Sequence, residues 1–335
     1  MRRLTLILSD LYLPEESARG ELPRIQELPQ LSWLLSRARE PEAVGDWRSW
    51  LLRQIGGPMA QRPLATLCAS ERLGDADIEN AWLATPVALE ARLDHVRMKD
   101  RGLLYIDVDE RRAWCAEFNR VFGPQYLLHD GGERAFILSG ALPTTHTVDP
   151  ARLLGDEIGP ALPGADAPEL RRLGAEIEMW LHGSALNEAR ERAREPRLSS
   201  LWVWGRNAAV QASPGTEARE VELHGGDPLL CALGRAWHSP VRATPSGFAQ
   251  VDTRRAHVLA EFAVLTGSAH ESLAELDPNW FAAARHALAR GALSQLEIVA
   301  NDRCFRITPH AHWRFWRAHR GWLENLARPA GSPQV

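Results

Sequence analysis

Lysine is almost absent from this sequence. Lys99 is the only lysine among 39 basic residues, so arginine provides nearly all of the positive charge. The arginine side chain is planar and can bind a carboxylate or a phosphate through two parallel hydrogen bonds. The bias is therefore compatible with a need for such donors, although codon bias alone would also produce it.

An excess of positive charge is also absent. The 335 residues carry a formal net charge of -4, from 39 basic and 43 acidic side chains. Nucleic-acid-binding domains usually present a strongly basic face, so we expect no nucleic-acid partner. The net charge does not exclude a small anionic ligand, because a pocket for such a ligand needs only a few local cations.

Long apolar runs are missing as well. The run at the N-terminus, Leu4–Leu8, is followed directly by Ser9 and Asp10. It is shorter than the apolar part of a secretory signal peptide, and a membrane-spanning helix needs about 20 apolar residues. We therefore expect no membrane segment and no membrane partner.

Cysteines are few and widely separated. No two of them have the close spacing of a zinc site, and nothing else in the sequence indicates an oxidising compartment. We therefore expect reduced thiols and a cytoplasmic location. The four cysteines are Cys68, Cys115, Cys231 and Cys304.

The two ends of the sequence alternate between strand and helix patterns. Leu4–Leu8 is typical of a buried strand, and Leu28–Arg39 and Asp46–Ile55 place their apolar residues on one helical face. This order is the opening of a doubly wound sheet. Near the C-terminus we expect helices at Asp227–Trp237 and at Pro278–Arg290, the latter capped by Asp277. His257–Val264 fits a strand or a buried helical turn, and 293–300 with 303–308 fit a hairpin.

The middle of the chain has a different pattern. Arg92–Asp107 fits two short strands around a turn at Lys99–Gly102, and Tyr126–Leu138 fits a second hairpin. Helices are predicted at Glu110–Phe122 and Ala167–His182, before a strand at Leu201–Trp204. The sequence thus predicts a hairpin-rich α+β segment next to the α/β part.

The segment from Glu176 to Gly205 is the most informative. It reads as a helix, an Asn187-Glu188-Ala189-Arg190 segment, a polar turn and a buried strand. It resembles the archaeal-type, cofactor-independent phosphoglycerate mutases, where a helix leads into His-Pro-Val-Asn-x-x-Arg, a Gly/Pro turn and an apolar strand ending in Gly. Here Ser184–Leu186 replaces His-Pro-Val, and Arg194–Ser200 replaces the turn.

Two further elements extend the resemblance. Asp149-Pro150 resembles the Thr-Asp-Pro of the mutases, and Arg314–Arg317 resembles a terminal element of the bacterial RpfE-type regulatory proteins. The chain is most similar to this RpfE-type family, which looks like a reduced relative of the mutases in the alkaline phosphatase superfamily. The resemblance implies an alkaline-phosphatase-like doubly wound sheet, formed by residues 1–81 and 199–330, with an insert at 82–198.

A working enzyme of this superfamily requires two metal ions, a Ser or Thr nucleophile and a late cluster of Asp and His ligands. Asp10 follows the first strand, where the superfamily has a metal ligand, but it also suits an ordinary loop. The histidines of the last third are scattered, and no acidic-Gly-His turn appears. We therefore assign no catalytic residue and expect no cofactor. A divalent metal, with Asp10 as a ligand, belongs to the enzyme alternative.

The resemblance also marks ligand-binding candidates. Asn187 and Arg190 match the segment that lies near the cleft of the mutases, and His182 is the nearest histidine. Asp10 and Asp149 complete the set. A structural interpretation competes with this one, in which the asparagine ends a helix and the arginine pairs with a carboxylate.

Tryptophan is unusually frequent, with 13 residues. Trp313, Trp316 and Trp322 lie in His312–Leu326, for which we predict a terminal helix that packs on the sheet. A partner surface is the alternative for these residues.

Together these patterns favour a non-catalytic regulatory or binding protein on a degenerate phosphomutase scaffold. Its ligand would be a small anion with a phosphate or carboxylate group, or else a protein partner. One alternative is an active, metal-dependent phosphomutase or phosphatase. A second is a structural subunit that uses a Trp-rich surface. The sequence does not determine the oligomeric state.

Overall fold

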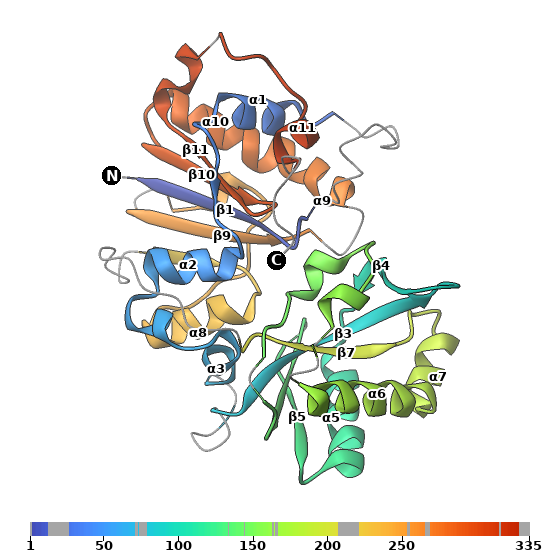
Figure 1. Cartoon of the computed structure of the whole chain (residues 1–335). Coiled ribbons are helices and arrows are strands. Elements are labelled where there is room, and N and C mark those ends of the chain that lie inside the picture. Colours follow the sequence, from blue (N-terminus) through green and yellow to red (C-terminus); the bar gives the residue numbers. More distant parts are fainter. Residues whose placement is uncertain are drawn as a thin grey trace. The chain divides into compact units, whose positions relative to one another are not determined.

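The chain forms two compact units in a computed structural model (Figure 1). The first unit combines Met1–Gly57 with Ser213–Val335, and the second is Pro58–Ala212. The sequence-based boundaries lie instead at 81/82 and 198/199. Each unit is described by itself. The residues described are 2–12, 27–70, 73, 79–132, 134–143, 145–162, 164, 167–206, 221–252, 255–264, 269–314 and 316–327.

The first unit contains a six-stranded sheet with the order β2-β11-β10-β1-β9-β8. The strands from β10 to β8 are parallel, and β11 and β2 form an antiparallel edge. Helices cover both faces, with α1, α10 and α11 on one and α2 and α8 on the other (Figure 1). The predicted doubly wound α/β sheet is thus confirmed. The strands are β1 (Arg3–Ser9), β2 (Glu42–Ala43), β8 (Val221–His224), β9 (His257–Ala263), β10 (Gln295–Ala300) and β11 (Arg303–Ile307). The helices are α1 (Pro29–Arg37), α2 (Trp47–Ile55), α8 (Pro228–Ala236), α9 (Ala269–Leu276), α10 (Ala282–Ala289) and α11 (Trp322–Leu326).

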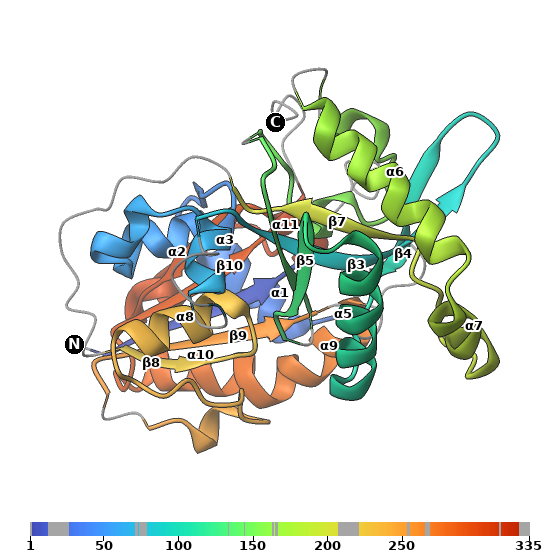
Figure 2. The ribbon, with the colours of Figure 1, turned by 90° about the horizontal axis from the view of Figure 1, so that it is seen from below.

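The second unit is an antiparallel α+β structure. Four of its strands follow the order β4-β3-β6-β5, and β7 also pairs with β3. Helix α5 packs along β5 and helix α6 along β7 (Figure 2). The strands are β3 (Ala81–Ala91), β4 (Val96–Leu103), β5 (Tyr126–Asp130), β6 (Phe136–Gly140) and β7 (Ser200–Trp204). The helices are α3 (Leu64–Ala69), α5 (Val108–Phe122), α6 (Pro168–His182) and α7 (Ala185–Arg192).

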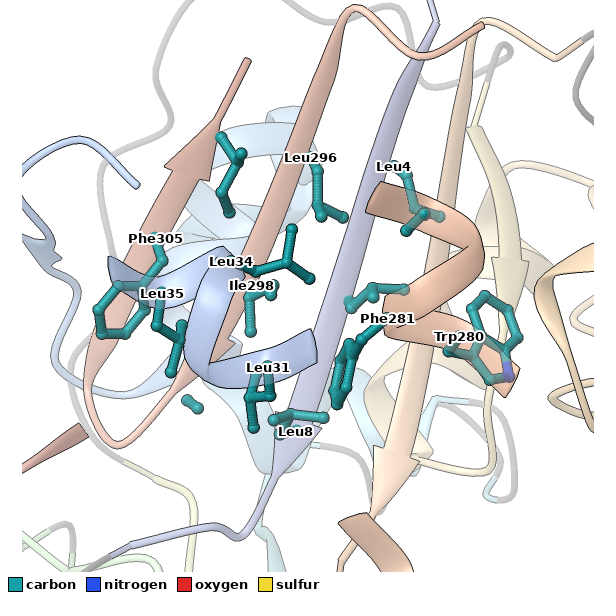
Figure 3. Packing of buried hydrophobic residues seen from close by; sticks show 14 of the residues in the cluster. Leu4, Leu8, Leu31, Leu34, Leu35, Trp280, Phe281, Leu296, Ile298 and Phe305 are labelled. Carbon is teal, nitrogen blue, oxygen red and sulfur yellow. The ribbon is translucent and has the colours of Figure 1, made fainter. Parts of the chain in front are cut away.

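One face of the first sheet is apolar. Alternate residues of β1, from Leu4 to Leu8, point toward α1 and α10 and are almost fully buried. Figure 3 shows Leu31, Leu34 and Leu35 of α1 against this face. Truncating such a leucine to alanine typically costs about 2–5 kcal/mol, so this layer fixes how β1 and α1 pack.

The opposite face holds a buried polar cluster. Glu297 of β10 accepts two-pronged hydrogen bonds from Arg3, at 2.6–2.9 Å, and a third contact from Arg306 at 3.1 Å. The Thr5 hydroxyl lies 3.0 Å from Glu297 and 2.9 Å from Nε2 of His257. Burial and, after it, the charge of Arg3 lower the pKa of His257 to about 4. Nδ1 of His257 has no hydrogen-bond partner among the described residues.

Aspartates begin several helices, and Asp227 does so as predicted. Asp46 accepts hydrogen bonds from the first turn of α2, Asp107 from that of α5, and Asp227 from that of α8. The prediction for Asp277 was wrong. The helix is continuous from α9 through a π-helical turn, Asp277–Phe281, into α10, so it has no free amides at this point. The Asp277 carboxylate instead accepts from the amides of Gln30 and Leu31, at 3.2 and 2.8 Å, and caps α1.

Two other local predictions were wrong. The Lys99–Gly102 segment is not a turn but part of β4, since the chain reverses earlier, where the Arg92 amide bonds to the His95 carbonyl. The terminal helix does not extend over His312–Leu326. A 3-10 helix, Pro309–Trp313, is followed by irregular chain and then by the short α11.

Arginine–carbonyl contacts explain the missing terminal helix. Arg314 donates to the carbonyl of Arg37, and Arg317 donates to that of Ala38. In return Arg37 donates to the carbonyls of Arg314 and Arg317. These tertiary bonds use carbonyls that a helix would need for its own amides. Trp322 is buried, Trp313 and Trp316 are exposed, and Phe315 lies outside the described residues.

No helix in the described part of the chain is both long enough and apolar enough to cross a membrane.

Candidate functional site

Asp10 lies at the carboxyl end of β1, the edge at which open α/β sheets bind ligands. Its backbone is left-handed, with φ of 65°, and its side chain is buried. Arg48, on α2, is the neighbour that neutralises it, at 3.6 Å. The same guanidinium bonds to Asp227 at 2.8 and 3.1 Å and lies over the Trp47 ring. One buried arginine therefore connects two buried aspartates.

The neighbouring strand β9 contributes another acidic residue, Glu261, near the end of β1. The Ser9 hydroxyl donates a short hydrogen bond to Glu261 of β9 and also contacts the carbonyl of Phe262 at 3.0 Å. The other carboxylate oxygen of Glu261 accepts from the Gly226 amide at 3.2 Å. Each carboxylate oxygen of Glu261 thus accepts one hydrogen bond from the chain itself.

The residues described at this edge do not form the two-metal centre that the superfamily resemblance implies. Two metal ions need several carboxylate and imidazole ligands that converge. Here Asp10 and Asp227 face a guanidinium, whose positive charge takes the place that a cation would need. Within the residues described, no three His, Cys, Asp or Glu side chains are grouped so that they could hold a metal ion.

Asn187 lies in the first turn of α7 in the second unit and is buried. Its amide nitrogen donates to the carbonyls of Leu181 and Leu198, both at 2.8 Å, and its oxygen accepts from the Leu198 amide at 2.8 Å. The side chain thus joins the end of α6 to the chain that enters β7. Three satisfied bonds give this residue a structural task.

Arg190, one turn further along α7, is also buried and bonded. Its guanidinium contacts both carboxylate oxygens of Glu110 at 2.7 Å and the carbonyl of Pro196 at 2.6 Å. The pair with Glu110 ties α7 to α5. Both sequence candidates of the Asn-x-x-Arg segment therefore have the partners that the structural interpretation expects.

A pocket of about 360 Å³ opens beside Asn187. His182, at the end of α6, Lys99 of β4 and Arg197 provide basic groups in its wall, and Glu178 provides a carboxylate. Burial raises the pKa of Glu178 above its ordinary value, against the effect of a hydrogen bond from Ser200. The pocket is lined by Leu89, Lys99, Glu178, His182, Asn187, Arg197, Leu198 and Ser199.

The five sequence candidates are thus distributed over different places. His182 and Asn187 line the same pocket. Arg190 is buried next to Glu110, and Asp149 accepts from the Ala151 amide at 3.0 Å at the start of a 3-10 helix, Pro150–Leu153. Asp10 belongs to the sheet edge of the other unit. A ligand-binding role for any of them stays a prediction.

Sequence reasoning missed Lys99, Glu178 and Arg197 as pocket residues. They come from β4, α6 and the chain before β7, so no local motif contains all three. One signal was present, since Glu178 and His182 are four residues apart on a helix and therefore share a face. A second signal was that Lys99 is the only lysine of the sequence, although this did not indicate where in the fold it lies.

No protein-family model and no curated protein matches the chain. Among solved structures, it is similar to the cofactor-independent phosphoglycerate mutase of Thermoplasma acidophilum, with 14% identity over 100% of this chain and 96% of that one and a TM-score of 0.42. It is also similar to the PH0037 protein of Pyrococcus horikoshii, with 12% identity over 92% and 87% and a TM-score of 0.42. These values are too low to transfer a function, and the RpfE-type resemblance stays a prediction.

Proposed function

We propose that the chain is a non-catalytic binding protein, with a regulatory role, on a degenerate phosphomutase-like scaffold. Its ligand is a small anion with a phosphate or carboxylate group, and the binding site is the pocket of the second unit. The observation on which this proposal depends is the convergence of Lys99, His182 and Arg197 on one cavity.

The charges of the pocket support an anionic ligand. Lys99 contributes a point charge, and Arg197 contributes a planar group suited to two-pronged contacts. Arg197 already bonds to Glu191 at 2.8 Å and to the His182 carbonyl at 3.1 Å, which holds it beside His182. Glu178 is the one carboxylate among the lining residues, and burial raises its pKa above the ordinary value. An anion would therefore meet more positive than negative charge.

The floor of the pocket supports a preformed site. Asn187 and Leu198 are buried, and the amide bonds between them hold the end of α6 against the chain before β7. His182 and Arg197 project from these two segments. A ligand would not have to order them first, which lowers the entropic cost of binding.

Calorimetric titration of the whole chain tests the proposal. Inorganic phosphate and 3-phosphoglycerate are the probes, and glycerol is the uncharged control. We expect at least one anion to bind and Lys99→Met to weaken it at least tenfold, or about 1.4 kcal/mol. Arg171→Met, on the same unit but away from the pocket, is the matched control and should bind as the parent does. Failure of both anions to bind, or equal affinity in Lys99→Met, would refute the pocket.

The pairing of Asp10 with Arg48 supports the non-catalytic part of the proposal. We expect little or no phosphoglycerate mutase activity with manganese, cobalt, zinc or magnesium. Robust turnover that Asp10→Ala abolishes would establish the enzyme alternative instead.

A further inference from the structure

The segment before α11 has a local charge unlike that of the whole chain. No acidic residue occurs between Asp302 and Glu324, although the chain as a whole is negative. The same interval contains five arginines and three histidines. Basic residues are therefore concentrated in one short stretch of a chain whose net charge is negative.

Two tryptophans in this stretch are exposed. The exposed fraction is 62% for Trp313 and 69% for Trp316. The ring of His312 packs on that of Trp313 with centroids 4.9 Å apart. Large exposed aromatic side chains are unfavourable in water and are enriched at protein–protein interfaces.

Arg306 and Arg320 of this stretch pair with carboxylates, at 2.7 and 3.3 Å, but the arginines beside the tryptophans differ. Within the described part of the chain, Arg37, Arg39, Arg314 and Arg317 form no ion pair; the bonds of three of them go to backbone carbonyls. A carbonyl satisfies a donor but does not neutralise its charge. Burial lowers the pKa of Arg314, and the charges of Arg317 and Arg39 lower it further, as expected where cations crowd together.

The segment is held in place on the first unit. The Ser36 hydroxyl contacts the backbone of Arg320 at 3.0 and 3.2 Å, and the Asn325 amide reaches the Arg320 carbonyl at 3.1 Å. Together with the arginine–carbonyl bonds, these contacts fix an irregular chain in one conformation. The exposed side chains are therefore presented on an ordered support, which limits the ordering cost of binding.

We propose that a Trp–Arg surface, consisting of Arg39, His312, Trp313, Trp316 and Arg317, docks an acidic segment of a protein partner that also bears apolar side chains. Carboxylates would pair with the guanidinium groups, two hydrogen bonds at a time. Apolar side chains would cover the two tryptophans. Tryptophan and arginine are the residue types that dominate the binding energy of protein interfaces.

The other anionic macromolecules fit less well. Nucleic-acid binding relies on many phosphate contacts over a basic face, whereas this surface is small and belongs to a chain of net charge -4. Membrane-surface binding usually uses an amphipathic helix, and the described residues between the 3-10 helix and α11 are not helical. An acidic protein segment needs neither feature.

Fluorescence anisotropy with a labelled twelve-residue peptide of alternating Glu and Leu tests the proposal on the whole chain. A Lys-Leu peptide is the control for apolar contact alone. We expect binding of the Glu-Leu peptide that weakens with added salt, and no binding of the Lys-Leu peptide. The double variant Trp313→Ser/Trp316→Ser, and separately Arg39→Glu, should weaken binding at least tenfold.

Two matched variants on the second unit control for general effects. Met179→Ser removes an exposed apolar side chain, and Arg171→Glu reverses an exposed charge; both should bind as the parent does. Thermal unfolding of every variant verifies that the fold is kept. Equal binding by the tryptophan variants and the parent overturns the proposal, as does absence of peptide binding. Tighter binding to single-stranded DNA or to phosphatidylserine vesicles than to the peptide also overturns it.

Discussion

At the scale of single residues, Arg48 has the most consequential position. It is a buried cation between Asp10 and Asp227, and all three come from different elements of the first unit. Removing the arginine from such a group leaves the carboxylates without this counter-charge in a poorly solvated place. The arrangement therefore makes a sharp prediction about stability that does not depend on any ligand.

Arg48→Met should destabilise the first unit by about 3–5 kcal/mol, because two carboxylates lose their counter-charge. Urea unfolding monitored by circular dichroism measures this. The triple variant with Asp10→Asn and Asp227→Asn should recover a large part of the loss, since asparagine can still cap α8. A single variant as stable as the parent would show that the three charges are not coupled.

At the scale of elements, the sequence predicted best where the signal is local. The strand β1, helices α1, α2 and α8, and the β10–β11 hairpin follow from apolar periodicity, capping aspartates and the Asn301-Asp302 turn, whose residues have φ of 47° and 60°. Predictions failed where distant groups compete for the backbone. The arginines of the terminal segment bind carbonyls of α1 and Ala38, and no pattern within 312–326 could reveal that.

The candidate site shows the same division. The Asn-x-x-Arg pattern led to a segment in which Asn187 and the nearby His182 line a pocket, and their role in binding stays a prediction. It did not reveal Lys99 or Arg197, since those side chains meet only after β4, α6 and the chain before β7 have packed. When the residues of a site come from separate elements, they have no characteristic spacing along the sequence, so one sequence cannot reveal them.

The sheet of the first unit also predicts a pH dependence. His257 on β9 has a folded-state pKa of about 4, below its ordinary 6.5, so the native state binds fewer protons than the unfolded chain between these values. Stability is then fully present above pH 6.5 and falls as the pH drops toward 4. Replacing the histidine with a neutral side chain should flatten this part of the curve.

Denaturant unfolding of the parent and of His257→Gln between pH 4 and 7 measures the effect. The free energy of unfolding should depend more steeply on pH in the parent than in His257→Gln, and only in that window. Its total change across the window should be on the order of 3 kcal/mol larger in the parent. His286, an exposed histidine of α10, offers a control, and His286→Gln should leave the slope unchanged. Identical curves for parent and His257→Gln would contradict the assignment.

At the scale of the whole molecule, the two units differ in how the chain builds them. The second unit is one continuous stretch with its own core, in which Trp82, Trp114 and Phe118 are fully buried. The first unit needs both ends of the chain, because β1 lies between β9 and β10. We therefore expect the second unit, but not the N-terminal part of the first, to fold by itself.

A fragment spanning 58–212 should therefore fold alone, with a cooperative thermal transition and dispersed amide signals in NMR spectra. A fragment spanning 1–57 should not, because β1 would have neither neighbour. The informative comparison is a mixture of the fragments 1–57 and 213–335. Dispersed amide signals in the NMR spectrum of this mixture would show that the first unit assembles without the second. A 58–212 fragment without cooperative unfolding would refute the independence.

The central place of β1 has a consequence for synthesis on the ribosome. Thr5 and its neighbour His257 are 252 residues apart in the chain. At a translation rate of about 5–20 residues per second, β1 emerges roughly 10 to 50 seconds before the strands that cover its edges. During that delay an apolar strand is available to other nascent chains, while the second unit is already complete enough to fold. We therefore expect folding to depend on a chaperone that shields the first nascent residues. Depleting that chaperone should shift newly made protein from the supernatant to the pellet.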